Sequence, residues 1–434
     1  MRDKRILTAL ALLLTALALC AAAYAEEAED ITPGCTFKLC SSSRRATSMT
    51  DRKYTTYWES NKIRNPYIAI TSETPMYGLY LCFRRMPSSY AIQTFVGGED
   101  GMETDLVPRA GYRLETVRID NFQRKPTPAN LIHNVRAVSY LFSSRKNADR
   151  IIRDFRPDVI VGTGGYASYP MLRQGAKRGI PTALHEANAV PGLTTRLVME
   201  KVDRIMVSFE ESRANYPSPD RVRVVGMPVK REFFFTRKDE SRAALGLDDR
   251  PVVVSYWGSL GAREMNRKIA RFMALECREN TPFQHIHATG SYGWKWMPEY
   301  VKEQGADLDT YPAIDMREYI YDMPAVMAAA DLVICRAGAS TIAETAAAGK
   351  PAIFVPSPNV TDNHQEKNAR ILEDHGAAVV LRESECDGDR LYETAKSLLT
   401  DPKRLEDMGR AVQGLAVPDS TEKIYEIILE LTGA

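Results

Sequence analysis

The stretch CRAGASTIAETAAAGKPAIFVPSP, residues 335–358, overlaps the end of the short apolar run DLVIC, residues 331–335. An apolar run of this length between polar residues is typical of a strand buried on both faces of a parallel sheet. The alanine-rich residues behind it predict a helix, which Gly349 and Pro351 end. AIFVP is then expected to form the next strand, so the stretch predicts a βαβ unit.

The loop between this strand and this helix lies at the carboxyl end of a strand, where open α/β sheets bind ligands. Gly338 relieves the turn, and Ser340 or Thr341 is expected to cap the helix. The helix amino terminus favours an anionic or hydroxyl-rich ligand, because its N–H groups are unpaired and carry partial positive charge. Glu344, about one turn further on, either accepts hydrogen bonds from sugar hydroxyls or only complements the helix dipole.

The composition indicates a globular protein with two or three domains. The chain has 434 residues, of which 44% are hydrophobic and 26% are charged. Its 57 lysines and arginines nearly balance its 56 acidic residues, so no overall field favours nucleic acid as a partner. The seven cysteines form no CxxC pair and no zinc-binding spacing. We therefore expect neither a metal site nor a nucleic-acid partner.

Residues 1–25 have the composition of an export signal. The basic opening MRDKR precedes a run of small and apolar residues from 6 to 23, and AYA at 23–25 has the form of a cleavage site. An uncleaved membrane anchor is the alternative, since the run is near the minimum length for spanning. The scattered cysteines of the later chain are instead typical of a reduced, cytosolic protein.

Residues 26–93 consist of short runs rich in Thr, Tyr, Ile and Phe, separated by turn residues. This pattern predicts strands of an antiparallel β-sandwich. The segment DRKYTTYWES, residues 51–60, resembles the opening half of a discoidin domain. The resemblance covers residues 30–93, about half of such a domain, and half a sandwich leaves strand edges and a core face uncovered.

From residue 94 the pattern changes to alternating strands, loops and helices. FVGGEDGMETDLVPRAGY predicts a strand, a glycine turn and an amphipathic helix that Gly111 ends. Gly226 and Pro228 mark a linker to a second series, which begins at PVVVSYWGSLGA. The pattern predicts the α/β class with two doubly wound domains, residues 94–228 and 229–388, and helices over 389–434.

Three loops carry candidate binding residues. GSLGAREMN, residues 258–266, could present backbone N–H groups and the Ser259 hydroxyl to a diphosphate, or it could be a plain tight turn. GTGGYASYP, residues 162–170, has the same form in the first domain. VTDNHQEKN is a polar cluster suited to sugar hydroxyls, unless its aspartate simply caps a helix. The residues of this cluster are Asp362, His364, Gln365 and Asn368.

HEANAVPG places His185, Glu186 and Asn188 on a loop at the end of another predicted strand. A histidine beside a glutamate is more often a structural pair than a catalytic one, and both interpretations stay open. His285 and His287 share one strand face without a third ligand nearby, and we expect them to be structural.

Residues 131–158 alternate apolar and basic side chains. Such a basic amphipathic face either contacts an anionic bilayer or is a solvated helix surface. Its basic residues are Arg136, Arg145, Lys146, Arg150 and Arg153.

Five motifs, in order, are together similar to the MurG family of glycosyltransferases: GTGGYASYP, HEANAVPGLTTR, GSLGA, ICRAGASTIAETAAAGKPAIFVP and DNHQEKNA. The resemblance runs from residue 94 to the carboxyl terminus. It implies a GT-B fold, with an acceptor-binding first domain and a nucleotide-sugar-binding second domain. It also implies inverting transfer of N-acetylglucosamine from UDP-N-acetylglucosamine to lipid I, the undecaprenyl-pyrophosphoryl-muramoyl-pentapeptide, which gives the lipid II of peptidoglycan.

The same resemblance implies no cofactor, no metal and a peripheral location at the cytoplasmic face of the bacterial membrane, against an anionic surface. The signal-like residues 1–25 conflict with this location, since they imply export or anchoring.

Roles for particular donor-site residues follow from the resemblance. Glu344 would accept hydrogen bonds from the ribose hydroxyls, and the backbone of Ile320 would contact the uracil. The diphosphate would be held by Ala339, Ser340, Thr341 and Ser259.

On the transferred sugar and the acceptor, Gln365, with His364 beside it, would contact the N-acetylglucosamine hydroxyls, and Asn188 would lie near the reaction centre. Lys230 occupies a position where the family has arginine. The general base is not identified by the resemblance, and His185 and Glu186 are the candidates.

The first domain departs from the family. MurG proteins begin with a strand that leads into a Gly-Gly-Thr-Gly-Gly-His loop, and no such stretch precedes FVGGEDG. We therefore expect the family's first strand, first helix and loop histidine to be missing. The chain is interpreted as a fusion of two gene fragments, or an assembly error, joined near Gln93. The second domain is expected to bind the UDP-sugar, and the first to be too incomplete for normal turnover.

Two alternatives remain open at this point. The chain could be an exported protein that binds glycans through its discoidin-like part, with the α/β part as a non-catalytic scaffold. It could also be another GT-B enzyme that acts on a different lipid or glycan acceptor.

Overall fold

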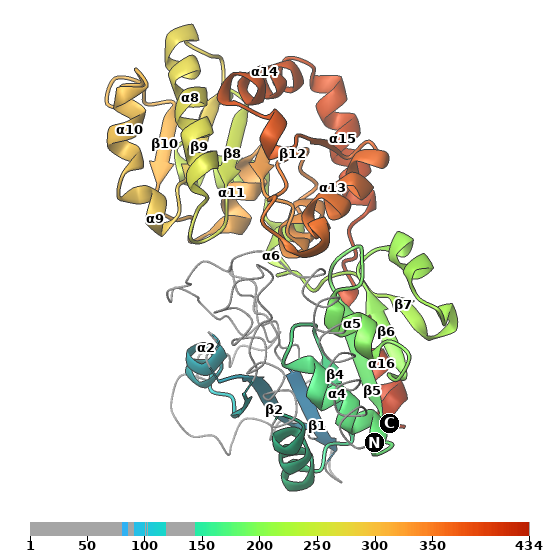
Figure 1. Cartoon of the computed structure of the whole chain (residues 1–434). Helices are drawn as coiled ribbons and strands as arrows, with labels where there is room; N and C mark the ends of the chain where they lie inside the picture. Colours follow the sequence, from blue (N-terminus) through green and yellow to red (C-terminus); the bar gives the residue numbers. More distant parts are fainter. Residues whose placement is uncertain (1–79, 86–90, 100, 102, 119–143, 434) are drawn as a thin grey trace, which may run out of the picture.

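The structure is a computed structural model that describes residues 80–85, 91–99, 101, 103–118 and 144–433 (Figure 1). It contains two α/β domains, one above the other in Figure 1. The signal-like segment, most of the discoidin-like fragment and Arg136 lie outside the described residues.

The first domain is built on a seven-stranded sheet with the order β3-β2-β1-β4-β5-β6-β7. All neighbours in it are parallel except those of β1. Its strands are β1 (Tyr80–Arg85), β2 (Ala91–Gly98), β3 (Leu114–Val117), β4 (Val159–Gly162), β5 (Thr182–Glu186), β6 (Arg204–Val207) and β7 (Val222–Val224). Its helices are α2 (Glu103–Arg109), residues 144–155, α4 (Ser168–Lys177), α5 (Leu193–Val198) and the 3-10 helices η2 (Glu210–Asn215) and η3 (Pro219–Arg221).

Strand β1 comes from the segment that the sequence assigned to a separate β-fragment. It lies between β2 and β4 and is antiparallel to both, with Tyr80 opposite Val96 on one side and Gly162 on the other. Strand β2 also runs across the boundary predicted between residues 93 and 94. The sheet therefore has a strand where we expected a missing one, but its direction is reversed. Strands β2 and β4 run in the same direction and end at the edge of the sheet where β1 begins. The carboxyl end of β1 therefore lies at the opposite edge, and the loop that follows β1 does not reach the edge where β2 and β4 end.

The second domain has a six-stranded, fully parallel sheet with the order β10-β9-β8-β11-β12-β13. This is the doubly wound order, so the fold predicted for both domains is confirmed. The strands are β8 (Val252–Tyr256), β9 (Gln284–Ala288), β10 (Ile314–Arg317), β11 (Leu332–Cys335), β12 (Ala352–Phe354) and β13 (Ala378–Val380). The helices are α6 (Glu232–Phe235), α7 (Lys238–Leu245), α8 (Arg263–Glu279), α9 (Ser291–Trp294), α10 (Met297–Glu303), α11 (Met323–Ala329), α12 (Ala339–Ala347), α13 (His364–Asp374), α14 (Gly388–Leu399) and α15 (Pro402–Gly414).

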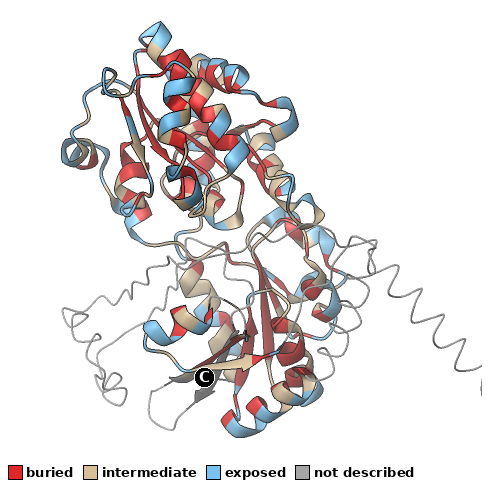
Figure 2. Cartoon of the chain, turned by 60° about the vertical axis from the view of Figure 1, so that its left-hand side comes forward, coloured by how far each residue is buried: buried red, intermediate tan, exposed pale blue. Residues whose placement is uncertain are grey.

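Both sheets are buried between helices, and the central strands are buried along their length (Figure 2). The apolar runs that predicted these strands therefore form the core, as expected for parallel sheets covered on two faces. His285 and His287 lie in this core. Both rings are fully buried, and each places a ring nitrogen 2.7 Å from the Ser255 hydroxyl. His285 also pairs with buried Glu276 at 2.9 Å, so the predicted structural role agrees with their surroundings.

The chain crosses between the domains twice, and the two crossings touch. Gly226, in the predicted linker, has a φ of +74°, and a Cβ on it would lie 2.5 Å from Cβ of Val417. Past Val417, helix α16 (Ser420–Thr432) returns to the first domain. Its Ile427 packs into the same apolar cluster as Val159 and Met206. The last of the predicted carboxyl-terminal helices thus belongs to the first domain, whereas α14 packs on α8 of the second.

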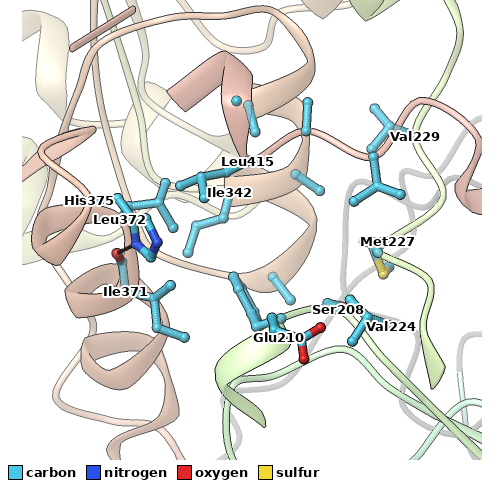
Figure 3. A pocket seen from close by; sticks show the side chains of 18 of the residues that line it. Ser208, Glu210, Val224, Met227, Val229, Ile342, Ile371, Leu372, His375 and Leu415 are labelled. Atoms are coloured by element: carbon cyan, nitrogen blue, oxygen red, sulfur yellow. Dashed lines mark hydrogen bonds between the residues drawn. The ribbon is translucent and has the colours of Figure 1, made fainter. Parts of the chain in front are cut away.

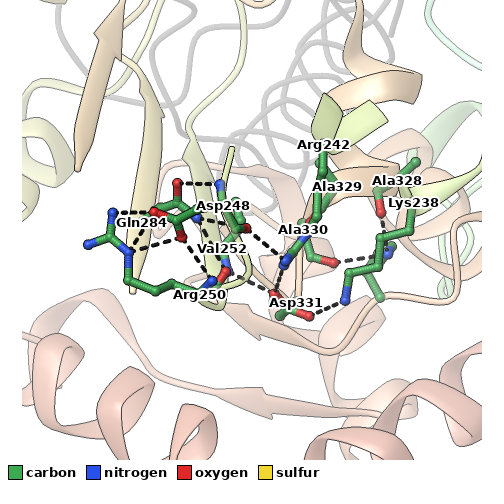
Figure 4. Close-up of polar contacts among 11 residues, drawn as sticks. Lys238, Arg242, Asp248, Arg250, Val252, Gln284, Ala328, Ala329, Ala330 and Asp331 are labelled. Carbon is green, nitrogen blue, oxygen red and sulfur yellow. Dashed lines mark hydrogen bonds and ion pairs between the residues drawn. The ribbon is translucent and has the colours of Figure 1, made fainter. Parts of the chain in front are cut away.

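A polar cluster closes the second domain at the amino ends of β8 and β11 (Figure 4). Asp331 accepts hydrogen bonds from the Val252 N–H at 2.7 Å and from Arg242 at 2.5 Å, and it pairs with Lys238. Lys350 donates to the carbonyls of Ala328 and Ala330, at the end of α11. Since ligands of such sheets bind at the carboxyl ends of the strands, this cluster is structural.

Candidate functional site

Three loops leave the carboxyl edge of the second sheet side by side, because their strands pair in register. Cys335 at the end of β11 lies opposite Tyr256 of β8 and Phe354 of β12. Residues 257–262, 336–338 and 355–363 therefore start at the same edge, and the loop after β10 carries Ile320. The sheet thus gathers the predicted donor-site residues of GSLGA, CRAGAS and DNHQ.

The GSLGA loop is shaped by glycines that pack backbone against backbone. Gly258 and Gly261 have φ angles of +86° and +80°, and the Gly261 N–H donates to the Gly258 carbonyl. A Cβ on Gly261 would lie 2.0 Å from the Thr289 carbonyl oxygen, so the loop needs glycine there. Ser259 is half-buried in this turn, ahead of α8. The tight turn and the predicted phosphate loop are therefore the same structure.

Helix α12 begins at Ala339, two residues earlier than a Ser340 cap would require. Gly338 is the extended residue before the helix, and no side chain caps it, so the predicted cap at Ser340 or Thr341 is wrong. Both residues lie instead in the first turn, where Ser340 is exposed and Thr341 is half-buried. The first-turn N–H groups of a helix have no partner within the helix, which is the predicted arrangement for an anionic ligand.

Glu344 lies half-buried on α12, on the helix face that also carries Ser340 and Thr341. The other face of the helix, with Ile342 and Ala346, packs into the core. Ile320 is also core-packed, with 2% of its surface exposed. Only its main-chain groups can therefore face a ligand, which agrees with the predicted backbone contact to a base.

The loop that leads into α13 is strained. Asp362 and Asn363 both have left-handed φ angles, of +53° and +52°. Asp362 does not cap the helix, because its carboxylate pairs with Arg196 of the first domain at 2.7 Å. Consecutive non-glycine residues in this conformation persist only where their surroundings hold them, as at ligand sites.

His364 and Gln365 form the first turn of α13. His364 places Nδ1 2.8 Å from the Thr361 carbonyl. Burial lowers the pKa of His364, while this carbonyl and the charges of Glu186 and Asp362 oppose the shift. Gln365 accepts a hydrogen bond from the Ser357 N–H at 2.9 Å, and its amide nitrogen has no partner among the described residues. Both side chains are half-buried and carry donor or acceptor groups that a sugar could use.

In the first domain, Glu186 at the end of β5 organises the HEANAVPG loop. Its carboxylate is 6% exposed and accepts hydrogen bonds from the N–H and the side-chain amide of Asn188, from the Gly192 N–H and from the Thr195 hydroxyl. These bonds use both oxygens and favour a positioning role over proton transfer. His185 is directed elsewhere, with Nε2 2.9 Å from the Gly226 carbonyl in the linker. Burial lowers the pKa of His185, while the Gly226 carbonyl and the Glu186 charge oppose that shift.

The two domains meet at this loop. Asn368, on α13, hydrogen-bonds to the Ala189 N–H at 2.8 Å and to the Asn188 side chain at 3.1 Å. Together with the pair between Arg196 and Asp362, these bonds hold the loop after β5 of the first domain against α13 of the second. The sequence predicted a sugar-binding role for Asn368 and missed Arg196. The local sequence does not indicate these contacts, because Asn368 and Ala189 lie 179 residues apart along the chain, and Asp362 and Arg196 lie 166 residues apart.

Lys230 follows the linker just before α6 and is half-buried. Beside the linker lies a cavity of about 260 Å³ between the domains (Figure 3). It is lined by Ile342 and Ala346 of α12, by Met227 and by Leu415 of the second crossing. Ala339, one of the predicted diphosphate residues, also lines the cavity, whereas Ser340, Thr341 and Glu344 do not.

Among the described residues, no group of three or more His, Cys, Asp or Glu side chains could hold a metal ion. In the same part of the chain, no helix has the length and apolar character needed to cross a membrane.

The basic helix of residues 144–155 uses some of its charged side chains in contacts within the first domain. Arg150 pairs with Glu115 and Asp154, and Arg145 hydrogen-bonds to Tyr169.

Two doubly wound domains, the second with a helix amino terminus and a glycine turn at one edge of its sheet, are the arrangement of the GT-B class. The sequence matches the glycosyltransferase family 28 N-terminal domain over residues 86–207 and the family 28 C-terminal domain over residues 252–424. The chain belongs to the MurG family within this class.

The curated relatives have one name in common, UDP-N-acetylglucosamine–N-acetylmuramyl-(pentapeptide) pyrophosphoryl-undecaprenol N-acetylglucosamine transferase. The protein of this name from Caldanaerobacter subterraneus is 39% identical over 339 residues, which are 78% of this chain and 91% of the relative. That of Ruminiclostridium cellulolyticum is 40% identical over the same shares. Among solved structures, Acinetobacter baumannii MurG has a TM-score of 0.59 and 25% identity, over 77% of this chain and 90% of its own.

Proposed function

We propose that this chain is an inverting glycosyltransferase that moves N-acetylglucosamine from UDP-N-acetylglucosamine to lipid I and so forms lipid II. The relatives carry the name of this reaction, and the match covers both domains. This coverage favours a transferase over a non-catalytic scaffold. The observation that carries the proposal is the α12 amino terminus, with Glu344 on the same helix face, beside the Ser259 loop at one sheet edge.

In the proposed reaction, the acceptor hydroxyl attacks the anomeric carbon of the sugar while the bond to the UDP oxygen breaks. Negative charge then develops on the departing diphosphate. The first-turn N–H groups of α12 and the Ser259 hydroxyl would stabilise this charge. Glu344 would bind the ribose hydroxyls, and Gln365 with His364 would hold the sugar.

Both candidates for the general base that accepts the hydroxyl proton are engaged by other groups. Glu186 is engaged by four hydrogen bonds, and His185 faces the linker. Both therefore fit positioning roles. In the family, the first strand leads into a loop that carries a histidine. Strand β1 cannot supply such a loop to the edge where β2 and β4 end, because its own carboxyl end lies at the opposite edge of the sheet. We accordingly infer that transfer is slow, while donor binding is intact.

A peripheral place at the cytoplasmic face of the membrane belongs to the same proposal, because the acceptor is anchored in the bilayer by its lipid. Exposed Lys146 and Arg153 would face an anionic surface.

The experiment is release of UDP from UDP-N-acetylglucosamine by the full chain, with and without a lipid I analogue. We expect acceptor-dependent UDP release in the wild type and its loss in Glu344→Ala. Glu299→Ala, which removes an exposed glutamate of α10, should behave like the wild type. Release that does not depend on the acceptor, or that survives in Glu344→Ala, would contradict the proposed function.

A further inference from the structure

Asn368 connects the two domains at the candidate site. Its side chain is fully buried on α13. The amide oxygen accepts from the Ala189 N–H at 2.8 Å, and the amide nitrogen donates to Asn188 Oδ1 at 3.1 Å and to the Ala337 carbonyl at 3.3 Å. Ala189 and Asn188 belong to the loop after β5, and Ala337 belongs to the loop that starts α12. One side chain therefore joins the acceptor-side loop to the donor-side loop.

The orientation of this amide is fixed by its partners. A backbone N–H can only donate and a carbonyl can only accept, so the oxygen must face Ala189 and the nitrogen must face Ala337. The second N–H of the amide nitrogen then points to Asn188. No other small polar side chain offers one acceptor and two donors in this geometry.

The contact also sets the orientation of Asn188. Since Asn188 Oδ1 accepts from Asn368, its own amide nitrogen is directed to Glu186 Oε1, at 3.2 Å. A loop with Asn188 at its tip is thus held from both sides, by Glu186 within its domain and by Asn368 across the crevice. The carbonyl of Ala189 is held within the domain as well, by Ser212 and Asn215, both at 3.0 Å.

We propose that Asn368 is a positioning residue that couples occupancy of the donor site to the loop that carries Asn188. This inference rests on the proposed function, because it assumes that the UDP-sugar binds at the amino terminus of α12. A ligand there orders residues 336–338, the Ala337 carbonyl holds the Asn368 amide, and the amide holds Ala189 and Asn188. Donor binding in one domain would thereby prepare the acceptor side of the other.

The test is site-resolved hydrogen exchange of the full chain, with and without UDP. UDP should slow exchange of the Ala189 N–H in the wild type, although that residue lies in the first domain. In Asn368→Ala we expect about five-fold faster exchange of this N–H without UDP, from loss of one buried hydrogen bond, and no further response to UDP. UDP should still protect residues 336–344 in this variant.

Asn215→Ala is the matched control, because it removes a hydrogen bond to the same residue from within the first domain. Ser212 still donates to the Ala189 carbonyl there, so the response of the Ala189 N–H to UDP should persist. Asn368→Ser is a second variant in case the alanine variant does not fold, since its hydroxyl keeps a polar group in the pocket but is too short to reach Ala189.

Two results would overturn the coupling: UDP protects α12 in the wild type without any change at Ala189, or the Asn368 variants keep the full response. Absence of UDP binding by the wild type would instead count against the proposed donor site. In that case the comparison of Ala189 exchange without UDP still decides whether Asn368 holds the loop.

Discussion

Single carboxylates at the crevice have different surroundings, and these set their roles. Glu186 is almost completely buried and accepts four hydrogen bonds, so it fixes a loop. Glu344 is half-buried on the face of α12 that also carries the first-turn hydroxyls. The position of Glu344 could be predicted from the sequence, because a strand, a glycine turn and a helix fix its place within one βαβ unit. The four hydrogen bonds that Glu186 accepts from Asn188, Gly192 and Thr195 could not, since they depend on how residues 186–195 close into a loop.

The pKa of Lys350 predicts how the stability of the protein depends on pH. Burial lowers its pKa to about 8 from an ordinary value of 10.5, and the charge of Lys238 adds to this. Between about pH 8 and 10.5 the unfolded chain binds this proton more tightly than the folded chain does. The free energy of unfolding should therefore rise by about 2–3 kcal/mol as the pH is raised across this window. Below about pH 8 the Lys350 ammonium is protonated in both states, so this gain in stability is lost there.

The measurement is urea unfolding of the wild type and of Lys350→Met at pH 7 to 10.5. The variant lacks the titrating group, so the difference in unfolding free energy between wild type and variant should grow as pH rises. A difference that stays constant with pH would show that the Lys350 ammonium titrates normally in the folded protein.

Among the elements, loops determine what the regular structure presents. The helix over residues 339–347 could be predicted from its alanines and from Gly349, although it begins two residues before the start that a Ser340 cap would give. The close contact between the loops at 258–261 and 289–290 was not predictable, because it joins the ends of two neighbouring strands. A glycine in a sequence indicates a turn, but it does not show which backbone passes beside it.

Gly258 and Gly261 allow this contact to be tested, since their φ angles are nearly equal at +86° and +80°. Alanine at Gly258 meets nothing within 4 Å and should cost only the strain of a left-handed backbone, about 1–2 kcal/mol. Alanine at Gly261 would also collide with the Thr289 carbonyl oxygen at 2.0 Å. We expect a clearly larger fall in melting temperature for Gly261→Ala, measured by calorimetry. Equal effects would mean that the two loops separate at little cost.

For the whole molecule, the two doubly wound domains followed from the repeated strand–loop–helix pattern, and the family resemblance from five ordered motifs. The direction of β1 could not be predicted. Residues 80–85 carry no sign that they complete a parallel sheet, and their pairing with β4 spans a long stretch of chain. The sequence therefore indicated a missing strand, whereas the structure places an antiparallel one between β2 and β4.

This arrangement predicts where the chain can be shortened. A protein that begins at residue 80 keeps β1, whereas one that begins at residue 91 leaves β2 and β4 without a partner between them. We expect the shorter protein to lose hydrogen-exchange protection in β4 and β5, while the second domain keeps its protection. Full protection of β4 in the shorter protein would show that β1 is dispensable for the sheet.

The proposed function depends on a UDP-sugar site in the second domain, at the amino-terminal half of α12. Calorimetric titration of the full chain with UDP-N-acetylglucosamine measures this binding, with Glu344→Ala and the control Glu299→Ala alongside the wild type. We expect binding by the wild type and by the control, and roughly 10–100-fold weaker binding by Glu344→Ala from loss of charge-assisted hydrogen bonds. No binding by the wild type, or equal affinity in all three proteins, would show that the site is not there.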